Sequence, residues 1–85
     1  MSMVQQIIQA VTASERQIDE QVNRLTSYNE KISQTMQQVQ SQLGGSTQSY
    51  DQKMLQQLQQ TKKQLDDTIQ MLRNAKEKLT RVRAI

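Results

Sequence analysis

The residues of this chain that could take part in acid–base chemistry are two adjacent acidic pairs, Asp19-Glu20 and Asp66-Asp67. General acid–base catalysis by two carboxylates needs both groups to reach one substrate. Neighbouring residues on a helix point about 100° apart, so each pair predicts a hydrated helix surface. The sequence has no His, no Cys and no Gly-rich phosphate loop. We therefore expect a protein that is not an enzyme and uses no metal or cofactor.

Basic residues gather toward the C-terminal end of the sequence and raise the question of nucleic-acid binding. They are Arg73, Lys76, Lys78, Arg81 and Arg83. Cations at the end of a helix are also expected because they oppose the negative end of its dipole. The two aromatic residues, Tyr28 and Tyr50, are too few to form a stacking platform for bases. We expect a protein partner rather than nucleic acid.

The elements that position these side chains follow from a heptad pattern in the first half of the chain. Apolar residues recur every seventh position in one column, and a second column lies four residues further on. The first column is Val4, Val11, Ile18, Leu25, Ile32 and Val39; the second is Ile8, Glu15, Val22, Asn29, Met36 and Leu43. Alternating spacings of three and four residues are typical of a coiled-coil seam. The pattern predicts a helix over residues 3–43, with Ser2 and Gln5 as a capping pair.

The second half repeats the pattern after an interruption. Leu43-Gly44-Gly45 predicts the end of the first helix, because glycine readily adopts the left-handed conformation that closes a helix. A turn over 44–47 and a second helix over 48–84 follow. The second helix carries a leucine every seven residues: Leu58, Leu65, Leu72 and Leu79.

So short a connection makes the two helices antiparallel neighbours. We predict one all-α domain over residues 1–85, an antiparallel coiled-coil hairpin whose seam pairs residues with numbers that add to 90. The four pairs are Val11 with Leu79, Ile18 with Leu72, Leu25 with Leu65, and Ile32 with Leu58. Glu15 and Asn29 interrupt the seam, and polar seam residues commonly set the alignment of helices. In this register Glu15 faces Ala75 near Lys76 and Lys78, and Asn29 faces Thr61 near Lys62.

A single seam leaves other apolar residues without cover. We predict that Ile7, Leu55, Ile69 and Met71 lie outside the seam and form a partner interface. Small chains bury a modest fraction of their surface. We therefore expect a homodimer or a heterodimer with another helical hairpin, packed as a four-helix bundle.

The length, hairpin plan and turn resemble the WXG100 (ESAT-6-like) superfamily of small bacterial proteins. The resemblance rests on Leu43-Gly44-Gly45, Tyr50 and the leucine series that follows. It implies a part in type VII secretion, as a secreted substrate or as a targeting partner of a larger secreted toxin. Leu43 stands where the family has Trp, and the C-terminal Tyr-x-x-x-Asp/Glu signal is missing. The resemblance therefore favours the accessory role, beside the N-terminal helical domain of a toxin.

Two other functions remain open: a structural filament subunit similar to type III needle proteins, and a general coiled-coil adaptor. No stretch is long and apolar enough to span a membrane, and the first residues lack the features of a Sec signal peptide. We expect the protein in the cytoplasm before any export to the exterior.

Overall fold

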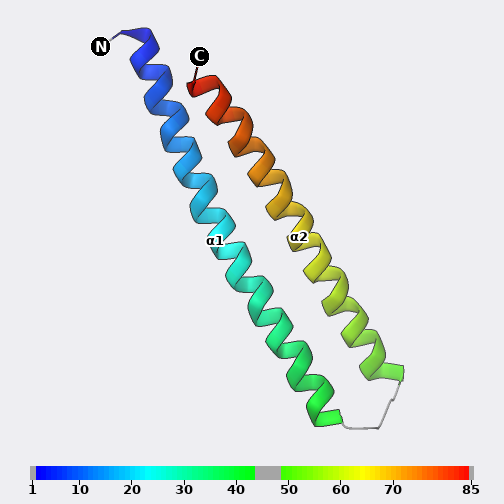
Figure 1. Ribbon diagram of the computed structural model, residues 1–85. Helices are drawn as coiled ribbons and strands as arrows, with labels where there is room; N and C mark the ends of the chain where they lie inside the picture. Colours follow the sequence, from blue (N-terminus) through cyan, green and yellow to red (C-terminus); the bar gives the residue numbers. More distant parts are fainter. Residues whose placement is uncertain (1, 44–48, 85) are drawn as a thin grey trace.

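The computed structural model describes residues 2–43 and 49–84 and contains two α-helices. Helix α1 runs over Met3–Leu43 and helix α2 over Ser49–Arg83. Figure 1 shows them side by side and antiparallel, with both ends of the chain at the same end of the rod. The Cα atoms span 66 × 14 × 14 Å. The expected all-α hairpin is therefore confirmed.

The helix ends agree with the sequence pattern to within one residue where the structure describes them. The hydroxyl oxygen of Ser2 accepts a hydrogen bond from the backbone N–H of Gln5 at 3.2 Å, so Ser2 caps the first turn of α1. Helix α1 ends at Leu43 as predicted, and α2 ends at Arg83 instead of residue 84. The predicted turn residues Gly44 and Gly45 lie outside the described residues, and their left-handed conformation stays a prediction.

The interface between the helices is a long seam without a thick core. Val11 and Ile69 are its buried apolar residues, and no side chain of the described chain is less than 2% exposed. Both helices contribute two columns of half-buried residues at alternating spacings of three and four. The half-buried members of these columns are Ile18, Val22, Leu25, Asn29, Ile32, Met36 and Val39 of α1 with Leu55, Leu58, Lys62, Leu65, Leu72, Lys76 and Leu79 of α2. All eight predicted seam residues are thus buried or half-buried.

The predicted register is wrong by about five residues. Glu15 is hydrogen-bonded to Thr80, Asp19 to Lys76 and Asn29 to Asp66; the two numbers in each pair add to 95 instead of 90. At 1.5 Å per residue the difference corresponds to about 7.5 Å along the axis. Asn, Asp and Thr side chains are too short to cover that distance. The apolar pattern of each helix repeats every seven residues. The shifted alignment therefore also places apolar residues of the two helices at the same height along the axis, for example Leu25 and Ile69.

Helix α1 extends beyond the end of α2. Val4 and Ile8 belong to the two seam columns of α1 but are exposed, as are Met3 and Ile7. The side chain of Arg83, the last residue of α2, reaches Glu15. The first two turns of α1 therefore lie past the last turn of α2.

Candidate functional site

Glu15 is the most enclosed charged group of the hairpin, with 8% of its surface exposed. The Thr80 hydroxyl donates to Glu15 Oε2 at 2.8 Å, and Arg83 Nε donates to Oε1 at 2.8 Å. The hydrogen bond from Thr80, and then that from Arg83, hold the pKa of the Glu15 carboxyl below its usual range. Glu15 therefore joins the end of α2 to α1 as a carboxylate. Its partners differ from the predicted neighbours Ala75 and Lys78 because the register is shifted.

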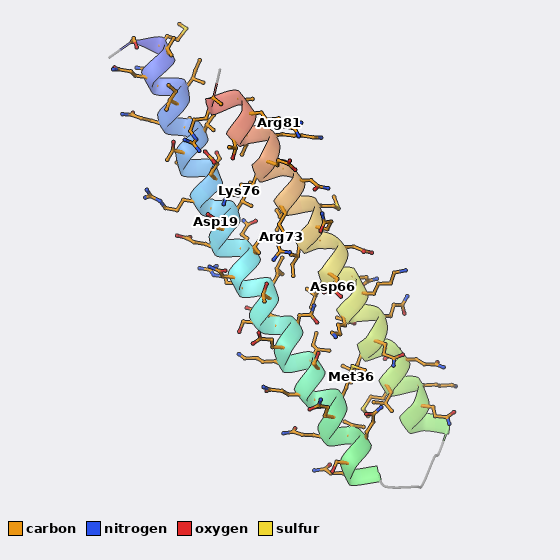
Figure 2. All side chains as sticks on the ribbon, viewed as in Figure 1. Asp19, Met36, Asp66, Arg73, Lys76 and Arg81 are labelled. Carbon is orange, nitrogen blue, oxygen red and sulfur yellow. The ribbon has the colours of Figure 1, made fainter. Side chains whose placement is uncertain are left out.

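The second cross-helix ion pair joins Asp19 and Lys76. Lys76 Nζ lies 2.7 Å from Asp19 Oδ1, and Figure 2 shows the two side chains beside each other between the ribbons. Asp19 is 53% exposed at its side chain, so water and salt weaken this contact. It marks the alignment of the helices more than it stabilises them.

Asn29 is the second polar residue of the seam. Its side-chain nitrogen donates a hydrogen bond to Asp66, not to the predicted neighbours Thr61 and Lys62. Its Oδ1 atom is buried and accepts no hydrogen bond within the described chain. A buried polar atom without a partner costs about 1–3 kcal/mol. Asn29 contacts one particular residue of α2 across the seam, and its role in setting the alignment stays a prediction.

These contacts lie on one side of the seam, which we call the charged flank. It comprises the heptad columns that follow the Val11 column of α1 and the Leu79 column of α2 by one residue. Its members are Gln5, Thr12, Asp19, Thr26, Ser33 and Gln40 of α1 with Gln52, Gln59, Asp66, Arg73 and Thr80 of α2. Surface grooves between the helices follow this side: one is bordered by Thr12, Asp19 and Lys76, and another by Ser33, Gln59 and Asp66. The second groove is bordered by residues of both columns, which therefore face the same way.

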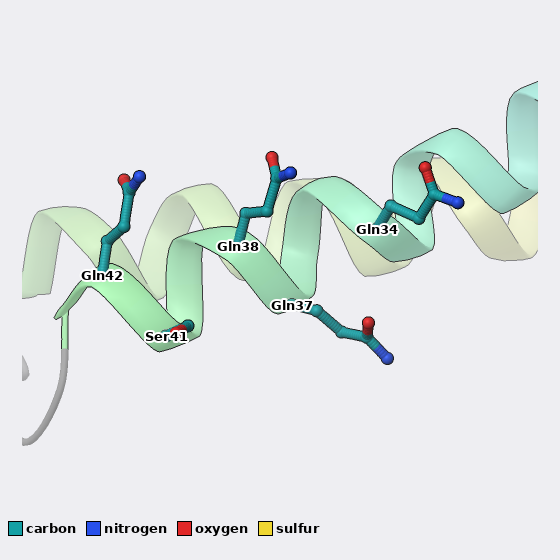
Figure 3. Close-up of a pocket in the computed structure, with 5 residues that line it drawn as sticks. All are labelled: Gln34, Gln37, Gln38, Ser41 and Gln42. Carbon is teal, nitrogen blue, oxygen red and sulfur yellow. The ribbon is translucent and has the colours of Figure 1, made fainter.

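Neither acidic pair forms a two-carboxylate site with its cross-helix neighbours. Asp19 contacts Lys76, and Asp66 contacts Asn29. Among residues 2–43 and 49–84, no three His, Cys, Asp or Glu side chains are grouped closely enough to hold a metal ion. The grooves are open to solvent. Figure 3 shows a separate shallow site, a strip of four glutamines and Ser41 that belongs to α1 alone.

The basic cluster at the end of α2 is largely paired with acids. Arg83 contacts Glu15, Lys76 contacts Asp19, and Arg81 contacts Glu77 at 3.3 Å. Charges neutralised in this way attract phosphates less strongly than free ones. The kind of partner stays a prediction.

The four residues predicted as a partner interface divide into two groups. Ile7 and Met71 are exposed, Met71 by 70%. Ile69 is 7% exposed and Leu55 is half-buried, so their placement outside the seam is wrong. The reason is the alternation of the repeat: Ile69 follows Leu65 by four residues and precedes Leu72 by three, which places it in the second seam column of α2.

The opposite side of the seam holds a surface that the sequence analysis missed, which we call the uncharged flank. It consists of Ile7, Ser14, Gln21, Tyr28, Thr35 and Gln42 of α1 with Met54, Thr61, Thr68, Ala75 and Val82 of α2. None of these residues is charged. Four of the large apolar residues exposed on the hairpin lie here: Ile7, Tyr28, Met54 and Val82. The signal was present in the sequence as two heptad columns without a single Asp, Glu, Lys or Arg.

The described helices contain no segment with the length and hydropathy of a membrane span. The chain was also compared with protein-family models, with curated proteins and with solved structures. No family model, no curated protein and no solved structure matches it.

Proposed function

We propose that this chain is a non-catalytic protein-binding module that acts by packing against another helical hairpin. The observation that carries the proposal is the surface area left exposed by the hairpin, 6855 Å². A compact monomer of 9.9 kDa exposes about 5,200 Å². The excess of about 1,700 Å² is larger than the roughly 800 Å² that each partner buries in a standard protein interface.

The distribution of apolar side chains supports the same proposal. Tyr28 is 53% exposed although it is one of the two aromatic residues of the chain. Ile7, Val82 and Met54 are exposed on the same flank. Burial of such side chains contributes about 1.5–3 kcal/mol each, and a few of them together offset the cost of association.

The more specific form of the proposal follows the resemblance of the sequence to the WXG100 superfamily. On that basis the chain is a bacterial secretion factor that pairs with the N-terminal helical domain of a larger secreted toxin. The hairpin form, the end of α1 at Leu43 and the long leucine-bearing second helix support it. The two alternative functions, a filament subunit and a general coiled-coil adaptor, use the same exposed surface. Experiment distinguishes them from the secretion role.

The test is to measure the mass of the purified chain in solution and to identify what it binds in its native host. We expect a particle heavier than 9.9 kDa, or capture of a protein that contains a helical-hairpin domain. A toxin with such a domain supports the secretion role, and fibres in electron micrographs support the filament. A chain that stays monomeric and captures no helical partner contradicts the proposal.

A further inference from the structure

We infer that the uncharged flank is the contact surface of a homodimer, in which two copies of this hairpin pack flank against flank. The inference rests on the proposed function and names the surface and the partner. It starts from the contrast in charge between the two sides of the seam. The charged flank carries Asp19, Asp66 and Arg73. Next to it, Lys76 is paired with Asp19, and Arg83 is paired with Glu15.

Charged groups are costly to bury at the centre of an interface, because each must lose its water. Interface centres are accordingly depleted in charged residues and enriched in Tyr and Met. The uncharged flank has this composition, with Tyr28 and Met54 among small residues such as Ser14, Thr68 and Ala75. The small side chains allow the backbones of two hairpins to approach, and the large ones supply apolar area.

The flank is also large enough. Both helices contribute to it from Met54 to Val82, about 42 Å at 1.5 Å per residue, and the hairpin is 14 Å wide. The product is about 600 Å² per copy, or about 1,200 Å² for two copies, which is the lower limit for a specific interface.

The lack of charge on this flank suits a second copy as the occupant. In a two-fold interface the same patch meets itself, so any charge on the patch lies near its own counterpart. Two copies each carry a net charge of +3 and repel each other weakly. The uncharged flank is the side of the seam on which this contact brings no like charges together. A strongly charged partner would find no opposite charge there.

The test uses two substitutions of the same chemistry on the same helix. Thr35→Glu places a carboxylate on the uncharged flank, and Thr26→Glu places one on the charged flank; both positions are exposed in the single hairpin. Sedimentation equilibrium measures the dimer dissociation constant, and far-UV circular dichroism checks that both variants stay helical. We expect Thr35→Glu to raise the dissociation constant about tenfold or more and Thr26→Glu to leave it nearly unchanged.

A second measurement does not depend on a disruptive charge. The chain has no cysteine, so Thr68→Cys on the uncharged flank and Thr26→Cys on the charged flank each introduce a single thiol. We expect the thiol at position 68 to react with a maleimide more slowly as the protein concentration rises, and the thiol at position 26 to react at a constant rate.

Equal effects of the two glutamate variants, or equal thiol reactivity, would overturn the assignment of the flank and leave the proposed function standing. A wild-type chain that remains at 9.9 kDa at every concentration would overturn the homodimer. The proposed function would then be decided separately by the capture of a hairpin-containing protein from the host.

Discussion

The two flanks of the hairpin share the same two helices and the same heptad repeat, yet they differ in chemistry. On the charged flank, Asp66 accepts a hydrogen bond from Asn29, and Asp19 pairs with Lys76. On the uncharged flank, Tyr28 and Val82 are exposed with no charged residue in their columns. Polar contacts are directional and therefore suit the alignment of two helices within the chain. Apolar contacts depend on area and suit association with another molecule.

The sharpest test of this comparison concerns Ile69, which belongs to the seam between the flanks. Ile69→Asp should destabilise the hairpin by about 3 kcal/mol, because it removes buried apolar area and introduces a carboxylate into the seam. Met71→Asp is the matched control, since Met71 is 70% exposed, and it should melt close to the wild type. Thermal melting at one protein concentration gives both values. Equal melting temperatures would mean that Ile69 is not a seam residue.

The second test uses pH to probe the Glu15 contacts on the charged side. The pKa of Glu15 is lowered in the folded hairpin. The stabilisation that its carboxylate gives to the folded state is therefore complete well above the ordinary Glu pKa of about 4.3. It is lost as the pH falls through the lower folded value. Glu15→Gln should reduce stability at neutral pH, by more than Asp19→Asn does, and should flatten the acid side of the stability profile. The exposed Glu20→Gln serves as the control of equal charge, and an equal response of both variants would contradict the assignment.

Asn29 allows the opposite change, a gain in stability. Asn29→Leu removes a buried oxygen that lacks a partner and adds apolar area to the seam. We expect the free energy of unfolding to rise by about 1 kcal/mol, measured by urea denaturation. Asn23→Leu on the exposed face of α1 should bring a much smaller change. A loss of stability in Asn29→Leu would show that the contact with Asp66 outweighs the cost of burying the amide.

The smallest effect is expected at the ion pair of Asp19 and Lys76. Asp19→Asn should cost about 0.5 kcal/mol at low salt, because the carboxylate is more than half exposed. The difference from the wild type should vanish at high salt, where screening is strong. Chemical denaturation at two salt concentrations measures it. A difference that persists in high salt would indicate a contribution other than charge.

Much of the architecture could be predicted because it depends on local sequence. The columns led by Val11 and Leu58, the stop after Leu43 and the cap at Ser2 each follow from residue types within a few positions of one another. The placement of Ile69 failed for a different reason. The leucine column alone puts Ile69 outside the seam, although its spacings to Leu65 and Leu72 place it in a second column. The uncharged flank can also be predicted from the sequence, because Asp, Glu, Lys and Arg are absent from both of its heptad columns.

The sequence by itself determined that the chain forms two helices, that the helices pair, and which columns lie in the seam. Their axial alignment was decided only in the tertiary structure. A heptad repeat is degenerate, because sliding one helix by about a turn still places apolar residues opposite apolar residues. The choice between alignments depends on a few contacts between distant residues, among them Glu15 with Thr80 and Arg83, and Asn29 with Asp66. Such pairs become apparent once the helices are placed side by side, because their members lie 37 to 68 positions apart in the chain.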